Sequence, residues 1–303
     1  MRKAVLAPLG VIAAGLVAAV IWAAWRHVTP WRDGVPPDPP GVGPEEVRFP
    51  SRDGTRIFGL FLPGRKGHPG IIFCHGYFKS LAEPFPLGLR LNREGYNVLL
   101  FDFRGCGRSG GRFTTIGYKE TWDVLAAVEW LKSRLSGAPV GVLGISMGAA
   151  AAIMAAAQTQ DIAALVLDSP YAHLEGVMRK KIPEFAPFRW MVPFGWASVL
   201  IGQLLSGGRL NSVRPVDHIA RLSPRPMLFI YGEHDSFIPH EQISELFEAA
   251  GEPKETWIAP GSDHAVARLD YPEEYEQRVL DFFGRHLRER PLRRTRARIS
   301  PPA

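Results

Sequence analysis

The chain has 303 residues, of which 46% are hydrophobic and 22% are charged, and this fits one large globular domain with shorter additions. Its two cysteines, Cys74 and Cys106, are too few for a disulfide framework, and no cluster of cysteines and histidines has the spacing of a metal site. The net charge of +6 equals that of the C-terminal segment alone, where seven arginines from Arg285 onward stand against one acid, Glu289, so it does not describe the body of the chain.

The first predicted element is a membrane-spanning helix over residues 1–25. The stretch from Ala4 to Trp25 contains no charged residue, and at about 1.5 Å per residue it can cross a bilayer core of about 30 Å. We expect an uncleaved signal-anchor, and hence a single-pass membrane protein, because the passable cleavage site lies inside the apolar run. Arg2 and Lys3 favour the orientation that places the catalytic domain on the extracytoplasmic side.

Residues 26–43 are rich in proline and glycine, which is typical of a semi-rigid extended spacer. In the domain that follows, over residues 44–287, short apolar runs predict strands at 46–49, 56–62, 70–74, 97–101, 140–143, 163–167, 227–231 and 255–258. Helical periodicity predicts helices at 118–135, 149–157, 241–250 and 274–287. This alternation predicts an α/β fold with a mostly parallel, doubly wound sheet.

One segment, at about residues 172–215, interrupts the alternation because it is far longer than a simple connection between strands. It is rich in large apolar residues, and we expect it to form a helical cap. Its side chains can line a hydrophobic pocket or touch a membrane, or they can bury one another, and the pattern leaves these interpretations open. Residues 288–303 are expected to form a basic, disordered tail, with binding to anionic lipid or nucleic acid as the alternative; no specific nucleic-acid partner is expected.

The most informative stretch is Gly-x-Ser-x-Gly at residues 144–148, which lies between a predicted strand and an alanine-rich helix. A turn this tight needs residues with almost no side chain at Gly144 and Gly148, and it leaves Ser146 at the apex in a strained conformation. The same geometry places the amide of Met147 at a helix N-terminus, where a negative oxygen would form. The pattern therefore predicts a nucleophilic serine.

Other segments resemble the α/β-hydrolase superfamily over roughly residues 45–287, and the order Ser, Asp, His is the one this fold uses. The segments that carry the resemblance are His75-Gly76, Asp102-Phe103-Arg104-Gly105-x-Gly-x-Ser, the turn from Gly144 to Gly148, Asp168-Ser169-Pro170, Tyr231-Gly232-Glu233-His234-Asp235 and Gly261-Ser262-Asp263-His264. The resemblance implies an α/β-hydrolase fold. With the elements predicted above, the domain carries a helical cap insertion and is preceded by one transmembrane helix.

Three side chains are the predicted catalytic residues. A serine hydroxyl needs a base, and His264, on a flexible turn after the last predicted strand, is expected to take the proton of Ser146. Asp235, on the turn after the preceding strand, is the predicted anion behind the imidazolium. Asp168 is the alternative acid, whereas Asp263 adjoins His264 in sequence and is not expected to align with its ring.

The resemblance implies that the oxyanion hole consists of two backbone amides, those of Tyr77 and Met147. Asp102 and Arg104 are predicted to form a structural charged pair that holds the glycine-rich loop. His75 is predicted to stabilise a turn.

The favoured function is a membrane-anchored serine hydrolase that cleaves a carboxylic ester or thioester of a hydrophobic acyl group through an acyl-enzyme on Ser146. The expected partners are a small-molecule ester or acyl substrate and the membrane, and no metal or cofactor is expected because the mechanism requires only water. Two alternatives are a serine peptidase or aminopeptidase of the prolyl-oligopeptidase-like type and a non-catalytic binding protein on the same scaffold.

Overall fold

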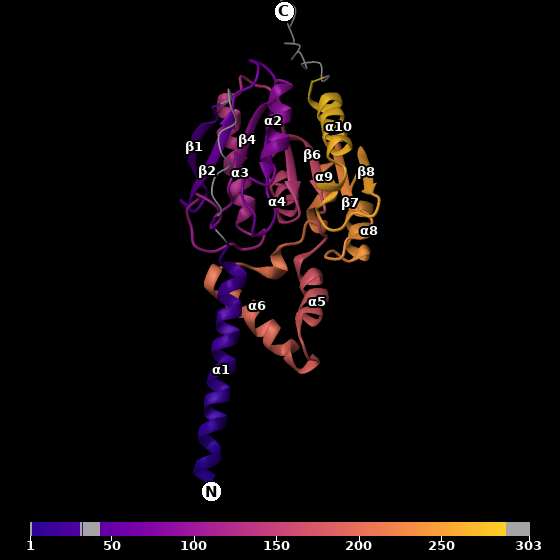
Figure 1. Ribbon diagram of the computed structural model, residues 1–303. Helices are drawn as coiled ribbons and strands as arrows, with labels where there is room; N and C mark the ends of the chain where they lie inside the picture. The colour runs from indigo at the N-terminus through magenta and orange to yellow at the C-terminus, as the bar shows by residue number, and fades with distance from the viewer. Residues whose placement is uncertain (1, 31, 33–42, 289–303) are drawn as a thin grey trace, which may run out of the picture.

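The structure is a computed structural model that describes residues 2–30, 32 and 43–288 (Figure 1). Residues 31 and 33–42 of the predicted spacer, and residues 289–303 of the predicted tail, lie outside the described residues.

The core is an eight-stranded sheet in the order β1-β2-β4-β3-β5-β6-β7-β8. The first three strands of this order pair antiparallel, and all the other neighbours pair parallel, which confirms the predicted mostly parallel sheet. The strands are β1 (Glu45–Pro50), β2 (Arg56–Leu62), β3 (Gly70–Cys74), β4 (Asn97–Phe101), β5 (Val140–Ile145), β6 (Ile162–Asp168), β7 (Met227–Gly232) and β8 (Lys254–Ala259).

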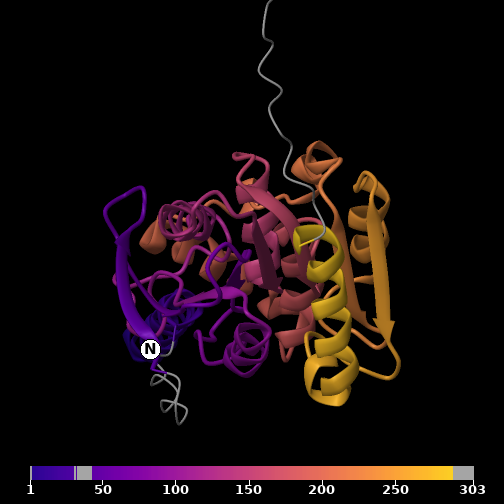
Figure 2. The same cartoon turned by 90° about the horizontal axis from the view of Figure 1, so that it is seen from above.

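Helices cover both faces of this sheet, and Figure 2 shows the sheet between the two helix layers. In β3, Ile72 and Cys74 belong to a core shared with α3 and α4, whereas Ile71 and Phe73 belong to a second core shared with α2 and α10. Because side chains alternate between two buried faces, the central strands are apolar except at Asn97, which begins β4, and Asp168, which ends β6. The helices around the sheet are α2 (Phe85–Arg93), α3 (Glu120–Arg134), α4 (Met147–Ala156), α7 (Val216–Ile219), η3 (Ala220–Leu222), α8 (His240–Ala249), α9 (Ala267–Asp270), α10 (Pro272–Phe283) and the π-helical turn η4 (Gly284–Arg288).

A pair of helices lies between β6 and α7, in the predicted cap segment. The segment consists of α5 (Leu174–Phe185), the 3-10 turn η1 (Arg189–Met191), α6 (Val192–Ser206) and the 3-10 turn η2 (Leu210–Ser212). Figure 1 shows α5 and α6 beyond one end of the sheet, on the same side as α1.

Helix α1 (Arg2–Val28) extends away from the domain and packs along α6 (Figure 1). Gly202 of α6 allows the close approach, because a Cβ there would lie 3.1 Å from Cγ1 of Val28 and 3.4 Å from the carbonyl oxygen of Ala24. Ala24 is fully buried in this contact. The helix is therefore packed against the cap over its last turns.

Over the described part of the chain, no single helix is both long and apolar enough to cross a membrane. Within α1, the apolar stretch Ala14–Val28 is shorter than a membrane span requires. Two consecutive helical segments, Arg189–Ser206 and Leu210–Leu222, are together long and apolar enough to cross a membrane, but their axes differ in direction by 78°. The predicted transmembrane helix at residues 1–25 stays a prediction.

Candidate active site

Ser146 occupies the turn between β5 and α4 with φ 51° and ψ −112°, a left-handed conformation that is rare for a residue with a side chain. The flanking glycines are required by close backbone contacts. A Cβ on Gly144 would lie 2.6 Å from Cα of Ala149, and one on Gly148 would lie 2.2 Å from the carbonyl oxygen of Cys74. Any side chain at these two positions would open the turn and displace the serine.

The structure brings the three predicted catalytic side chains together. Nε2 of His264 lies 2.9 Å from Oγ of Ser146, and Nδ1 of His264 lies 2.8 Å from Oδ2 of Asp235. Asp235 follows β7 and His264 follows β8, so neighbouring parallel strands deliver the two residues to the same edge of the sheet.

Asp235 is held as a fixed acceptor. Its side chain is fully buried, and Oδ1 accepts hydrogen bonds from the amides of Phe237 at 2.9 Å and Ile238 at 2.8 Å. When Nδ1 of His264 carries the ring proton and donates a hydrogen bond to Oδ2 of Asp235, the lone pair on Nε2 is free to accept a hydrogen bond from the hydroxyl of Ser146. This arrangement can activate the hydroxyl as a nucleophile.

The two other acids near this edge have different partners. Oδ2 of Asp168 accepts from the hydroxyl of Tyr275 at 2.9 Å, and Oδ1 accepts from Ser169 at 3.0 Å. Burial raises the pKa of Asp168. Asp263 accepts from the amide and hydroxyl of Ser236, so it holds the loop that carries the neighbouring Asp235. Neither carboxylate occupies the position behind the imidazole.

Tyr77 and Met147, the predicted oxyanion-hole residues, both line the cavity into which Ser146 opens. Met147 is the first residue of α4, and no hydrogen-bond partner for its amide or for that of Tyr77 is found among the described residues. The loop that carries Tyr77 is braced by Glu83, whose Oε2 accepts from the amide of Gly76 at 2.7 Å and whose Oε1 accepts from Arg268 at 2.9 Å. The two amides are thus available to a ligand.

Strained backbone is concentrated around this site. The described non-glycine residues with positive φ are Phe78, Ile116, Ser146, Ser169 and Ala265. Phe78, Ile116 and Ser146 line the cavity into which Ser146 opens. Ala265 directly follows His264, and its amide donates a hydrogen bond to the hydroxyl of Ser169 at 3.0 Å. Such residues cost about 1–3 kcal/mol each and persist where the surrounding structure holds them, which is typical of functional sites.

The predicted pair of Asp102 with Arg104 is wrong. The Arg104 guanidinium instead contacts Asp123 at 2.7 Å and Asp53 at 2.6 Å, whereas Asp102 accepts from the amides of Leu81 at 2.8 Å and Arg108 at 2.9 Å. Asp123 on α3 is fully buried, and a buried carboxylate needs the cation more than an acid satisfied by backbone amides does. The loop is held, but by a different set of contacts.

His75 has a structural position. Its ring is fully buried, and Nε2 accepts from the amide of Phe103 at 2.9 Å while Nδ1 lies 2.8 Å from the carbonyl oxygen of Gly76. Because the Phe103 amide can only donate, the tautomer is fixed with the proton on Nδ1. The ring joins the loops after β3 and β4.

The cavity next to Ser146 has a volume of about 650 Å³ and a mostly apolar lining. Helices α1, α5 and α6 all contribute to it, together with Ile116 and Tyr171 from the domain. The contribution of α1 was not predicted, because an apolar helix at an N-terminus carries no pattern that distinguishes a cavity wall from an anchor.

Two further residues near the histidine also lacked a sequence signal. The ring of Phe237 lies 5.2 Å from that of His264. The amine of Lys181, on α5, donates to the carbonyl of Ser236 at 2.6 Å and pairs with Glu184 at 2.6 Å, so it ties the cap to the loop of Asp235.

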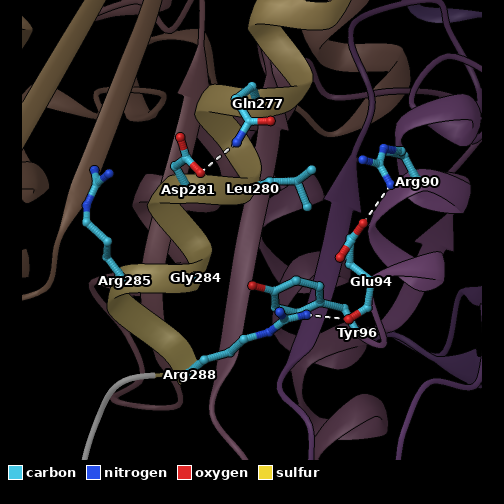
Figure 3. Close-up of a pocket in the computed structure, with 9 residues that line it drawn as sticks. All are labelled: Arg90, Glu94, Tyr96, Gln277, Leu280, Asp281, Gly284, Arg285 and Arg288. Carbon is cyan, nitrogen blue, oxygen red and sulfur yellow. Dashed lines mark hydrogen bonds and ion pairs between the residues drawn. The ribbon is translucent and has the colours of Figure 1, made fainter.

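A second cavity of about 540 Å³ lies between α2 and the end of α10 (Figure 3). Most of the residues that line it are polar or charged, and several already have partners: Arg90 pairs with Glu94, Gln277 with Asp281, and Arg285 with Glu255. It shares no lining residue with the cavity at Ser146.

Comparison with known proteins places this geometry in a family. A family profile described as the alpha/beta hydrolase fold matches residues 69–200. The uncharacterized protein Rv2307c of Mycobacterium tuberculosis is 31% identical over 293 residues, which cover 94% of each chain. The uncharacterized protein YfhR of Escherichia coli K12 is 28% identical over 256 residues, covering 81% of this chain and 82% of YfhR.

Among solved structures, the esterase Pf2001 of Pyrococcus furiosus superposes with a TM-score of 0.71 at 30% identity, and the match covers 86% of this chain and 98% of the esterase. An α/β hydrolase of Penicillium, GrgF, is similar in fold with a TM-score of 0.66 at 22% identity. The elbow at Ser146, the sheet order and these relatives agree, and the chain belongs to the α/β-hydrolase superfamily.

Proposed function

We propose that this protein is a serine hydrolase that cleaves a carboxylic ester or thioester of a hydrophobic acyl group. The observation that carries the proposal is the continuous pair of hydrogen bonds from Asp235 through His264 to Ser146, at the edge of an apolar cavity. The similarity to a protein described as an esterase supports the same reaction class.

In the first half-reaction, Nε2 of His264 takes the hydroxyl proton as Oγ of Ser146 attacks the acyl carbon. The carbonyl oxygen becomes an oxyanion, and the amides of Tyr77 and Met147 stabilise it by hydrogen bonds worth several kcal/mol. Collapse of the intermediate breaks the bond to the alcohol or thiol, which leaves with the proton from the imidazolium. Asp235 stabilises that imidazolium without taking its proton.

In the second half-reaction, a water molecule gives its proton to His264 and attacks the acyl-enzyme. The tetrahedral intermediate is held by the same two amides, and its collapse returns the proton to Oγ of Ser146 and releases the carboxylic acid. The cycle consumes one water and restores all three side chains, so the chain needs no other reactant.

The lining of the cavity favours an acyl substrate over a peptide. An aminopeptidase must hold a charged amino terminus, for which a carboxylate is the usual partner. Among the described lining residues there is no aspartate or glutamate. This observation supports the esterase proposal over the peptidase alternative, and a panel of aminoacyl amides beside p-nitrophenyl esters separates the two.

The nucleophile is tested with a fluorophosphonate probe, which forms a covalent bond with an activated serine. The wild-type protein is expected to be labelled on Ser146, and Ser146→Ala is expected to lose both labelling and ester turnover. Ser133→Ala, which alters an exposed serine of α3, is the matched control and should retain both. Labelling that persists in Ser146→Ala removes Ser146 as the nucleophile.

We further propose that the protein is attached to a membrane through α1, with the cap at the membrane surface. Large apolar side chains are exposed on both: Trp22 of α1 is 63% exposed, Phe185 of α5 is 74% exposed and Leu204 of α6 is 76% exposed. Exposed apolar surface of this kind, with a tryptophan in it, suits the interface of a bilayer.

Membrane attachment predicts that the full chain stays in the membrane fraction after alkaline carbonate extraction. Charge balance around α1 favours the catalytic domain on the extracytoplasmic side. Protease added from outside an intact membrane should then degrade the domain, whereas degradation only after the membrane is lysed reverses the orientation. Release of the chain by carbonate overturns the attachment.

A further inference from the structure

We propose that helix α1 forms one wall of the acyl-binding site, and that its residues set the length of acyl chain that the enzyme accepts. The inference rests on the proposed function and assigns the substrate class: esters or thioesters of long, flexible hydrocarbon chains. It gives α1 a part in substrate selection in addition to the attachment proposed above.

The first observation is the pattern of contacts along α1. Seven residues of α1 line the cavity that contains Ser146: Leu16, Ala19, Val20, Trp22, Ala23, His27 and Val28. Five of them share one face of the helix because 3.6 residues make one turn, and Trp22 and Val28 flank that face. Helix α1 therefore turns a continuous face toward the site, with one further residue on each side of it.

The second observation is that the end of α1 is bonded to the catalytic loops. The hydroxyl of Tyr77 donates to the carbonyl of His27, and the amide of Thr114 donates to the carbonyl of Val28 at 2.8 Å. The guanidinium of Arg26 lies over the ring of Phe78, 5.0 Å from its centroid. Since Tyr77 and Phe78 belong to the predicted oxyanion loop, the position of α1 is coupled to the reacting end of the cavity.

The third observation is the direction of the cavity. His27 lies at the level of Tyr77, whereas Leu16 is eleven residues earlier on the helix, about 16 Å away at 1.5 Å per residue. The cavity thus follows α1 away from Ser146 for about half the thickness of a bilayer core. Val177 and Ile182 of α5 and Phe194 and Val199 of α6 provide other parts of the wall.

These mostly apolar walls fit a hydrocarbon chain better than a polar occupant of similar length. Two cationic side chains also line the cavity, and the guanidinium of one of them, Arg209, lies over the ring of Tyr118, 5.9 Å from its centroid. The amine of Lys181 lines the cavity but is already bonded to Glu184 and to the carbonyl of Ser236. A short acyl group would contact only the residues next to Ser146, whereas each further methylene would gain contact with α1. Binding of long chains should therefore depend on α1, and binding of an acetyl group should not.

The experiment fills the cavity from α1 at two depths. The full-length chain in detergent micelles is assayed with p-nitrophenyl esters from acetate to palmitate, for wild type and for Ala23→Trp and Ala19→Trp. Both alanines line the cavity, and Ala23 is the nearer to Ser146. Ala18→Trp is the matched control, because Ala18 is exposed and outside the lining.

Ala23→Trp is expected to lower the ratio of kcat/KM for palmitate to kcat/KM for acetate by at least about tenfold. Ala19 lies farther from Ser146, so Ala19→Trp is expected to accept longer chains than Ala23→Trp before turnover falls. Ala18→Trp is expected to keep the wild-type chain-length profile. Unchanged chain-length profiles in both Ala23→Trp and Ala19→Trp overturn the proposal, as does an equal loss of palmitate turnover in Ala18→Trp.

The acetate rate and fluorophosphonate labelling of each variant report whether it has folded. If Ala23→Trp loses acetate turnover, the milder Ala19→Leu, which fills the cavity at the same depth as Ala19→Trp, decides. A wild-type protein that neither hydrolyses acetate nor takes the probe contradicts the proposed function itself. A wild type that prefers acetate to palmitate contradicts the role of α1 and the hydrophobic acyl substrate, but leaves the serine hydrolase reaction standing.

Discussion

The Nδ1 atom of His264 lies 2.8 Å from Oδ2 of Asp235, a carboxylate that is completely shielded from solvent. Two backbone amides hold the other oxygen of Asp235, so the carboxylate cannot rotate away from the imidazole without breaking three hydrogen bonds. The orientation of His264, and therefore the direction in which its Nε2 points, is fixed by this one contact.

Replacement of that carboxylate by an amide should leave the fold intact and remove most of the activity. In Asp235→Asn the new side chain can donate a hydrogen bond to Nδ1, which places the imidazole proton on Nε2 and leaves no base facing Ser146. We expect kcat for an ester to fall about 10³- to 10⁴-fold. Steady-state kinetics measure the loss, and thermal melting confirms that the variant is folded.

Asp168→Asn is the matched control, because Asp168 is equally buried but bonds to Tyr275 and Ser169. It is expected to retain kcat within about tenfold of wild type, a far smaller loss than that of Asp235→Asn. A folded Asp168→Asn protein that loses as much activity as Asp235→Asn would make Asp168 the catalytic acid.

The elbow glycines give a second prediction, on stability. In Gly148→Ala the added methyl would lie 2.2 Å from the carbonyl oxygen of Cys74, which is backbone and cannot give way. We expect a loss of at least about 2 kcal/mol in the free energy of unfolding, together with lost activity. Gly284→Ala adds the same methyl where no atom lies within 4 Å and should leave the stability within about 1 kcal/mol of wild type. Urea denaturation compares them, and equal stabilities would contradict the steric argument.

The features that could be predicted from sequence are those that depend on neighbouring residues. Gly144, Ser146 and Gly148 form a turn whose constraints act within a few residues, and the central strands are recognisable because both of their faces are buried. His264 and Asp235 could be proposed because strand ends meet at one edge of a parallel sheet.

The features that were missed or wrong depend on contacts between distant segments. Arg104 pairs with Asp123 and not with Asp102, because the amides of Leu81 and Arg108 already bond to Asp102. The face of α1 toward the cavity depends on where α6 lies, which a strand-and-helix pattern does not specify. Glu83, which braces the loop of Tyr77, lies in a segment without any motif.

The brace formed by Glu83 gives a third prediction. Glu83→Ala removes the acceptor of the Gly76 amide and the partner of Arg268, so the neighbouring amide of Tyr77 loses its fixed position. Oxyanion stabilisation acts mainly in the transition state, so kcat should fall about 10- to 100-fold with KM nearly unchanged. Glu94→Ala, which removes an acid at the end of α2 that pairs with Arg90, is the control. A rise in KM alone would show that Glu83 acts on substrate binding instead.

The contact of Asp53 with Arg104 gives a prediction on pH. Burial raises the pKa of Asp53, but hydrogen bonds from Arg104 and Thr55 outweigh it and lower the pKa to about 2. Because the folded-state pKa lies below the unfolded value of about 3.9, the contact stabilises the fold above pH 4, and this stability is lost as the pH falls toward 2. Asp53→Asn should therefore be less stable than wild type at pH 7, by about 1 kcal/mol or less because the pair is partly exposed. The difference between the two melting curves should shrink between pH 4 and pH 2, and a difference that stays constant over that range would show that the carboxylate charge of Asp53 does not contribute.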